Sequence, residues 1–261
     1  LGVEGSAIAT VMAQAISSLL CIIYVYKKIP LLSLNRNEFV MDKRLLKLSL
    51  QYSWVTALQQ TCLYVGKLLV QGAVNPFGTS AIAAYNSVTR VDSFVIAFGD
   101  SYSASVATYS AQNKGAGKMD RVIEGLRISH ITMAAYSIAL GFIIFIGAES
   151  IMKLFVESKE IEVIEVGLGY LKIISVFYIF SNANNVFQGL FRGIGKLRIT
   201  FWATFIQMAI RVILSYILSP YFGMNSIASA IGLGWVIMLL FELTCYKKYF
   251  KEEAIIGKSH L

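Results

Sequence analysis

Charged and amide side chains interrupt several otherwise apolar stretches of this 261-residue sequence, and they are its best candidates for chemistry. A charge in hydrocarbon is costly, so such a group generally faces a partner or a water-filled cavity. Amides between helices either bind a polar part of a ligand or hydrogen-bond across the helices. The candidates for a ligand or ion pathway are Gln59, Gln60, Lys67, Arg90, Asp92, Asp100, Asn184, Asn185, Gln188 and Arg211.

The two carboxylates of the stretch 79–112 differ in the partners that helical geometry allows. At about 100° per residue, Asp92 and Asp100 lie roughly 80° apart around a helix, while Arg90 faces away from Asp92. We therefore expect Asp100 to meet a group on a neighbouring helix. Two interpretations remain open for this carboxylate: a structural ion pair with Lys67, Arg90 or Arg211, and a protonatable transport site.

An amide cluster lies in the stretch "SNANNVFQG". Asn184 and Gln188 are four residues apart and Asn185 and Gln188 are three apart, so a helix places each pair on one face. Gln59 and Gln60 add two amides to the second apolar stretch. For both groups, contact with a polar part of a substrate and hydrogen bonding between helices remain open.

Two glycines directly after this cluster are spaced for close packing of helices. Gly189 and Gly193 are four residues apart in "GLFRGIG". Small residues at this spacing let two helix backbones approach closely inside a bilayer. We expect them to serve helix packing rather than ligand binding.

Patterns typical of enzymes and metal sites are absent from the sequence. The two histidines, His130 and His260, have no second metal ligand at helical spacing. The stretch "SAQNKGAGKMDR" is not a phosphate loop, because GxxxxGK[ST] would require glycine at Gln112 and serine or threonine at Met119. The sequence therefore predicts neither an enzyme nor a bound cofactor.

The segments that must position these side chains are long and apolar. The chain is 56% hydrophobic and only 15% charged, whereas soluble domains are roughly 25% charged. A membrane-spanning helix needs about 20 mostly apolar residues, and seven segments qualify. They are Gly2–Tyr26, Leu46–Val74, Thr79–Gln112, Val122–Ala148, Val163–Asn185, Ile199–Tyr221 and Ser226–Tyr246. The sequence predicts an all-α polytopic membrane protein with about seven transmembrane helices.

The charges of the connections alternate along the chain. The turn with Lys114, Lys118 and Arg121 is basic, the next connection with Glu157 and Glu160 is acidic, and "NPFG" is uncharged. Basic loops stay in the cytoplasm, so the C-terminus is predicted to be cytoplasmic. This distribution also accounts for the net charge of +8 without a nucleic-acid partner. Because the chain opens at Leu1 directly into an apolar segment, we expect a fragment of a longer membrane protein or a truncated gene.

Three stretches carry a resemblance to a known family. They are "GVEGSAIATVMAQ", "AIAAYNSVTRVDSF…ATYSAQNKGAGK" and "GLFRGIGKLRITF…RVILSYILSPYFGMNSIASAIGLGW". Together, in this order and spacing, the chain resembles the multidrug and toxic compound extrusion (MATE) family. That resemblance implies a partial MATE fold. Residues 1–26 would be the last helix of the N-terminal lobe, 27–47 a cytoplasmic linker, 48–248 the six-helix C-terminal lobe and 249–261 a cytoplasmic tail.

The resemblance also implies a function. It predicts part of an antiporter in the plasma membrane that exports drugs or organic metabolites, with Na⁺ or H⁺ as the coupling ion. Its partners would be membrane lipid, a small organic and cationic substrate, and the missing N-terminal lobe. A flippase for lipid-linked oligosaccharide, from a related fold, is the alternative.

One departure from the family pattern concerns the coupling ion. Members with a cation site in the C-terminal lobe place acidic residues in the helices that correspond to the second and fifth segments. Here the second segment has Gln59, Gln60 and Lys67, and the fifth ends in asparagines. This speaks against a cation site built from those two helices. We also expect that this chain by itself does not transport.

Overall fold

The computed structural model describes residues 2–29, 41–157 and 159–258, with side chains described except at positions 2, 3, 6 and 251–258. Seven α-helices and one short 3-10 helix dominate these residues, and no strand occurs among them. The α-helices are α1 (Gly2–Lys28), α2 (Lys43–Val74), α3 (Gly78–Gly115), α4 (Met119–Phe155), α5 (Ile161–Gly193), α6 (Leu197–Phe222) and α7 (Met224–Lys258), and η3 (Asn75–Phe77) joins α2 to α3. The all-α prediction is confirmed.

The seven predicted segments correspond to the seven helices, but their polarity differs. Within the described residues, five helices are long and apolar enough to cross a membrane, namely α1, α4, α5, α6 and α7. α2 and α3 are long enough, at 32 and 38 residues, but more polar. Lys67 interrupts α2, and Arg90, Asp92 and Asp100 interrupt α3. The protein is thus a multi-pass membrane protein, although composition alone supports five spans rather than seven.

The start of α2 differs from the prediction. The Asp42 carboxylate accepts hydrogen bonds from the backbone N–H groups of Arg44 (2.7 Å) and Leu45 (3.3 Å). This side chain therefore caps the helix, which begins at Lys43. The predicted linker 27–47 extends too far at its C-terminal end, and its positions 30–40 lie outside the described residues.

Two later helices are longer than predicted. α5 continues past Asn185 to Gly193, so the amide cluster lies inside the helix rather than at its end. α7 continues to Lys258, so most of the predicted tail 249–261 is helical. A mixed stretch of charged and apolar residues still forms a helix when it extends a stable one, because elongation adds a hydrogen bond per residue without a new nucleus.

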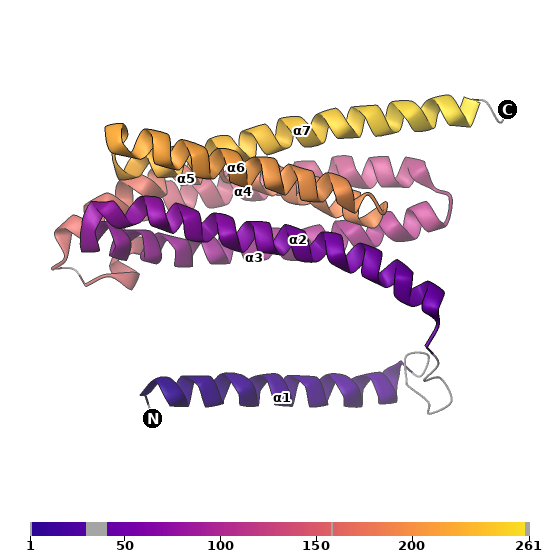
Figure 1. Ribbon diagram of the computed structural model, residues 1–261, viewed down its shortest axis with the longest axis horizontal. Coiled ribbons are helices and arrows are strands. Elements are labelled where there is room, and N and C mark those ends of the chain that lie inside the picture. The colour runs from indigo at the N-terminus through magenta and orange to yellow at the C-terminus, as the bar shows by residue number, and fades with distance from the viewer. Residues whose placement is uncertain (1, 30–40, 158, 259–261) are drawn as a thin grey trace. The chain divides into compact units, whose positions relative to one another are not determined.

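The described chain divides into two compact units, residues 1–50 and 51–261. In the second unit, α5 is the central helix and packs against α3, α4, α6 and α7. Figure 1 shows these helices running along one another as a bundle. Side chains on different faces of α5 therefore meet different neighbours.

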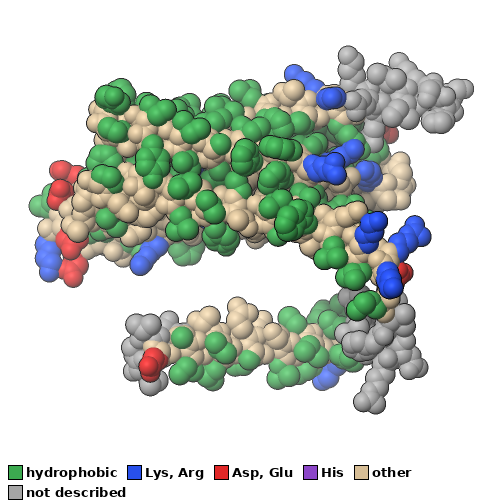
Figure 2. All heavy atoms as spheres, viewed as in Figure 1, with side chains coloured by type: hydrophobic (Ala, Val, Ile, Leu, Met, Phe, Trp, Pro, Cys, Tyr) green, Lys and Arg blue, Asp and Glu red, His purple; other side chains and the backbone are tan. Residues whose placement is uncertain are grey.

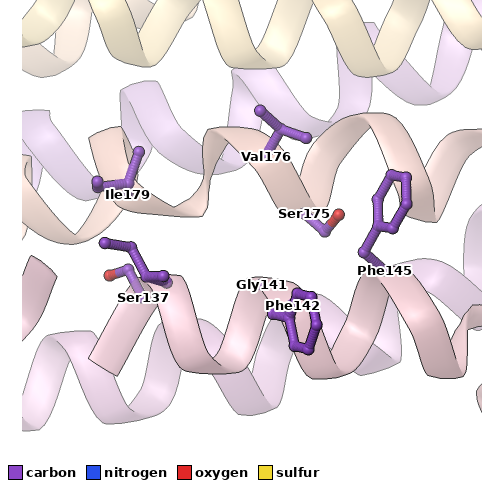
Figure 3. Close-up of a pocket in the computed structure, with 8 residues that line it drawn as sticks. Ser137, Gly141, Phe142, Phe145, Ser175, Val176 and Ile179 are labelled. Carbon is purple, nitrogen blue, oxygen red and sulfur yellow. The ribbon is translucent and has the colours of Figure 1, made fainter. Parts of the chain in front are cut away.

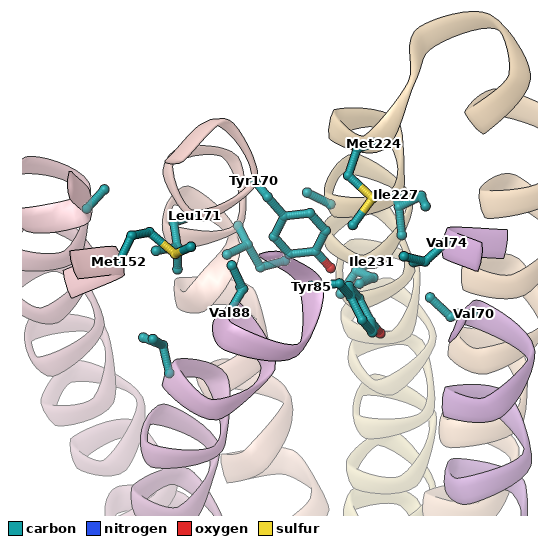
Figure 4. Close-up of a cluster of buried hydrophobic side chains, with 14 of the residues drawn as sticks. Val70, Val74, Tyr85, Val88, Met152, Tyr170, Leu171, Met224, Ile227 and Ile231 are labelled. Carbon is teal, nitrogen blue, oxygen red and sulfur yellow. The ribbon is translucent and has the colours of Figure 1, made fainter. Parts of the chain in front are cut away.

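The largest apolar core of the second unit lies toward the end where η3 joins α2 to α3. Figure 4 shows Tyr85 of α3 and Tyr170 of α5 in this core, with Val70 of α2 and Ile227 of α7 nearby. The two tyrosine rings meet edge to face at 5.9 Å. The core buries surface from five helices and so fixes this end of the bundle.

Gly189 and Gly193 bring the backbones of α5 and α3 into direct contact. A Cβ added at Gly189 would lie 2.5 Å from the backbone oxygen of Ser103, and one added at Gly193 would lie 2.8 Å from the Cβ of Ser110. No larger residue fits there without movement of the backbone. The predicted packing role is confirmed, and we call this contact the glycine seam.

Charged residues of the second unit gather at the two ends of its bundle (Figure 2). The turns from α3 to α4 and from α5 to α6 carry basic residues at one end, including Lys118 and Lys196. The connection from α4 to α5 carries Glu157 and Glu160 at the other end. The bundle thus places the basic connections together, as the alternation along the sequence requires.

Candidate functional site

A cavity of about 260 Å³ lies among α2, α3, α5, α6 and α7. Most of the residues singled out in the sequence line it, together with Arg192, Thr204, Gln207 and Trp235. Those predicted residues are Gln59, Gln60, Lys67, Asp100, Asn184, Asn185, Gln188 and Arg211. Segments 150 residues apart in the chain therefore build one polar site.

Helical spacing explains why these residues converge. On α6, Thr204, Gln207 and Arg211 recur at intervals of three and four residues and so form one stripe. On α5, Gln188 and Arg192 continue the face that Asn184 and Asn185 begin. α5 and α6 thus present polar stripes to the cavity, whereas α7 contributes Trp235 and Met238.

Hydrogen bonds connect one wall of the cavity to a carboxylate that the sequence analysis missed. The Gln59 amide on α2 donates to Oε1 of Gln188 on α5 (3.0 Å) and to Oγ1 of Thr204 on α6 (2.8 Å). Gln188 in turn donates from Nε2 to Oε1 of Glu242 on α7 (2.6 Å). We call Gln59, Gln188, Thr204 and Glu242 the buried polar network. It joins four helices through side chains that solvent barely reaches.

Glu242 is fully buried, with 0% of its surface exposed. The sequence contained one signal for it: an isolated acid near the end of the seventh apolar segment, just before Lys247 and Lys248. Acidic and basic residues in such proximity are also typical of a solvated helix end, so this signal is weak. Only the packing of α7 against α5 shows that this carboxylate points into the bundle.

Asp92 and Arg90 lie outside the cavity lining. The Asp92 carboxylate is partly buried and accepts a hydrogen bond from the Tyr178 hydroxyl on α5. Arg90 is exposed. As helical geometry predicted, the two side chains do not pair with each other.

The ion pair considered for Asp100 does not form. Among the described residues, the ion pairs within 4.0 Å are Lys153–Glu149 and Lys159–Glu157. Asp100 instead shares the cavity with Arg192 and Lys67, whose positive charges act on it from a longer distance. The cavity keeps the opposite charges apart, so the structural interpretation of Asp100 loses its basis.

Three buried polar atoms in or beside the cavity lack a hydrogen-bond partner among the described residues. They are Oδ1 of Asn184, Nε of Arg211 and Oε2 of Glu242. A buried polar group without a partner costs about 1–3 kcal/mol. Asn184 and Arg211 line the cavity, so a polar ligand there could hydrogen-bond to both of them.

Comparisons with known proteins agree with this geometry. The MatE family model matches residues 55–217, which is more than half of the chain. The chain belongs to the MatE family. The match covers α2 to α6, the helices that supply most of the cavity wall. It points to a transporter rather than an enzyme.

Curated MatE relatives carry names of multidrug resistance proteins. The chain is 26% identical to the probable multidrug resistance protein YoeA of Bacillus subtilis, over 98% of this chain and 56% of the relative. It is 24% identical to the probable multidrug resistance protein NorM of Thermotoga maritima, over 96% of this chain and 53% of the relative. The chain therefore spans about half the length of the curated relatives it matches.

Solved structures support the same fold. A crystal structure of MATE in complex with MaL6 superposes with a TM-score of 0.84 at 16% identity, over 96% of this chain and 58% of the other. An outward-facing structure of a multidrug resistance MATE family transporter superposes with a TM-score of 0.70 at 18% identity, over 74% and 43%. The helices described here thus form a partial MATE fold.

A second hollow in this MatE chain has a different chemistry (Figure 3). It has a volume of about 340 Å³ between α4 and α5, and its lining includes Phe142, Phe145 and Val176. Its two serines, Ser137 and Ser175, donate their hydroxyl protons to carbonyl oxygens of their own helices. No charged residue lines this hollow.

Proposed function

We propose that this chain is the C-terminal lobe, with one preceding helix, of a cation-coupled antiporter that exports small organic molecules. The observation that carries the proposal is the polar cavity among five helices, with its unpartnered buried atoms. The multidrug resistance names of the relatives support export as the direction of transport. The proposed complete transporter includes an N-terminal lobe that closes the other side of the cavity.

We propose that transport occurs by alternating access. Besides the outward-facing structure, an inward-facing structure of a multidrug resistance MATE family transporter superposes on this chain with a TM-score of 0.64 at 19% identity, over 68% of this chain and 40% of the other. A lobe that keeps its fold in both facings can rock against its partner around a central site. We propose that Na⁺ or H⁺ binding favours one facing and substrate binding the other, because coupling requires unequal affinities for the two states.

The charges around the cavity bear on the substrate. Lys67, Arg192 and Arg211 contribute three positive charges, and Asp100 contributes one negative charge. A cation would be repelled by this lobe. The cationic substrate expected from the family resemblance therefore stays a prediction for the whole transporter, and we propose that this lobe contacts an anionic or neutral part of the molecule.

The flippase alternative is less favoured. A lipid-linked oligosaccharide would need a site much larger than about 260 Å³. Of the three arginines that could give such a site a cationic wall, Arg192 and Arg211 line the cavity, whereas Arg90 is exposed outside it. The family match and the names of the relatives also support a multidrug exporter.

The basic end of the bundle supports an orientation. Loops with Lys and Arg remain in the cytoplasm. The basic turns from α3 to α4 and from α5 to α6 lie together, because Lys114 Nζ donates a hydrogen bond to the Ile194 carbonyl oxygen (2.7 Å). We propose a multi-pass protein of the plasma membrane with this end and the C-terminus inside.

Transport in vesicles tests the proposal. The intact transporter, reconstituted in lipid vesicles, is expected to move a fluorescent organic substrate when a Na⁺ or H⁺ gradient is applied, and to stop when an ionophore collapses that gradient. Transport that needs ATP and persists without either gradient would refute cation coupling. Labelling of a cysteine placed next to Lys258 from the outside of intact cells would refute the orientation.

A further inference from the structure

The carboxylate of Glu242 ends the buried polar network, and its surroundings are unusual for an acid. It is fully buried, and it lies within a helix apolar enough to cross a membrane. An ionised carboxylate in such a place needs a counter-charge to offset the loss of water. Among the described residues, none forms an ion pair with it within 4.0 Å.

The hydrogen bonds of Glu242 satisfy only half of the carboxylate. Its Oε1 accepts from the Gln188 amide (2.6 Å), while its buried Oε2 has no partner among the described residues. A protonated carboxyl group keeps this arrangement and removes the charge, because the proton resides on the free oxygen.

Glu242 is also connected to the cavity. Gln188 lines the cavity and bonds to Glu242, so one amide separates the carboxylate from the space that a substrate would occupy. Arg192, one turn further along α5, also lines the cavity. Opening of the cavity to water would shorten the path of a proton to the carboxylate.

Few other titratable groups act on this position. Arg192 on α5 and Cys245 on α7 are the groups whose charge or thiol lies near enough to interact with Glu242. α2 and α6 contribute the neutral side chains of Gln59 and Thr204 to the same network. Whether Glu242 binds a proton therefore depends on its access to water and on the position of the Arg192 charge.

We propose that Glu242 is a proton-binding site of the C-terminal lobe, protonated when the network is dry and deprotonated when the cavity wets it. The role of this site in coupling rests on the proposed antiport function. Since the carboxylate comes from α7, it differs from the acids of the second and fifth segments that the family resemblance implies; the second segment has no acid, and the fifth ends in asparagines. Gln188 is then a positioning residue, because its hydrogen bond to Oε1 holds the carboxylate in place and leaves Oε2 free for the proton.

Infrared difference spectroscopy tests the site without relying on transport. The intact transporter in lipid vesicles is expected to show the carbonyl stretching band of a buried carboxylic acid, and the band should give way to a carboxylate signal as pH rises. Glu242→Gln should remove the band. Glu165→Gln, at an exposed acid on the central helix, should leave it unchanged.

Two further variants separate protonation from folding. Glu242→Asp should keep the band at a shifted frequency, and Gln188→Leu should shift it because the hydrogen bond to the carboxyl group is lost. If Glu242→Gln fails to fold, an unshifted band in both of these variants overturns the proposal. A band that survives in folded Glu242→Gln overturns it as well, and so does a band that responds to added Na⁺ at constant pH but not to pH.

Transport measurements then test the coupling role. Glu242→Gln should lose acceleration of transport by a proton gradient while it still binds substrate. If the unsubstituted transporter moves no substrate under any gradient, the proposed function fails, whereas the infrared result still decides whether Glu242 binds a proton.

Discussion

The central helix α5 has two faces with opposite designs. Toward α3, Gly189 and Gly193 remove side chains so that backbone meets backbone. Toward α2, α6 and α7, Asn184 and Gln188 fill the space with amides that reach a cavity and a buried acid. The first face permits one close arrangement, whereas the second offers several donors and acceptors within reach of one another. One helix can therefore anchor the lobe and carry a polar site.

The two faces should respond differently to the same size of chemical change. On the glycine seam, one added carbon meets fixed backbone atoms. On the amide face, removal of one group leaves other polar groups without partners. On the glycine seam, stability should be lost because atoms overlap. On the amide face, it should be lost because polar groups lose their hydrogen-bond partners.

The largest expected effect comes from the glycine seam. Gly189→Ala should lower the free energy of unfolding by about 2–3 kcal/mol, because the new Cβ overlaps the backbone oxygen of Ser103. Unfolding in mixed micelles with increasing denaturing detergent measures this. Gly115→Ala is the matched control, because open space surrounds Gly115, and it should change stability by less than about 0.5 kcal/mol. If Gly189→Ala and Gly115→Ala change the free energy of unfolding equally, the close contact at Gly189 does not make this face sensitive to added atoms.

A somewhat smaller effect is expected on the amide face. Gln188→Leu should cost about 1–3 kcal/mol, because Glu242 and Gln59 both lose their shared partner. The same unfolding assay measures this, with Gln60→Leu, at an exposed position of the cavity wall, as the control. Adding Glu242→Leu should recover part of the loss, because the unpaired carboxylate is then gone. If Glu242→Leu lowers the free energy of unfolding by the same amount with and without Gln188→Leu, the two residues act independently.

The Asp92–Tyr178 contact should matter less. Tyr178→Phe removes the hydroxyl that donates to Asp92 and should cost about 1 kcal/mol. Tyr221→Phe, whose ring is 81% exposed, should change stability by less than about 0.5 kcal/mol. If the thermal unfolding midpoints of both variants equal that of the unsubstituted protein, the contact does not contribute to the fold.

The smallest effect on stability is expected at Lys67, where the readout is selectivity. Lys67→Gln should leave the free energy of unfolding within about 0.5 kcal/mol, because the side chain is exposed to the cavity. It should weaken binding of an organic anion and leave binding of a neutral analogue unchanged. Lys153→Gln, outside the cavity lining, is the control. Stronger binding of the anion to the Lys67 variant would contradict the proposed contact.

Much of the fold could be predicted because the position and length of each apolar segment can be read from the sequence. The seven segments located the seven helices, and the stretch "SNANNVFQG" located the amides that line the cavity. Helix ends were harder, since the cap by Asp42 depends on one local hydrogen bond.

The missed parts of the site depend on contacts between distant segments. Glu242 was not among the residues predicted for the site, because only the packing of α5 beside α7 places it next to Gln188. The ion pair considered for Asp100 was wrong for a related reason. Helical angles indicate a direction around one helix, but they do not give the distance to Lys67 across a cavity.

The polarity of α3 has a consequence for how the protein is made. Arg90, Asp92 and Asp100 each oppose insertion of a helix into the bilayer by about 2.5–3.5 kcal/mol near its centre. α3 therefore gains little by entering lipid alone, whereas α4 and α5 are apolar enough to enter by themselves. The glycine seam and the Tyr178 hydroxyl become available to α3 only after α5 has been synthesised. During biogenesis, α3 should accordingly remain beside the translocon until α5 emerges, so the order of membrane integration differs from the order of synthesis.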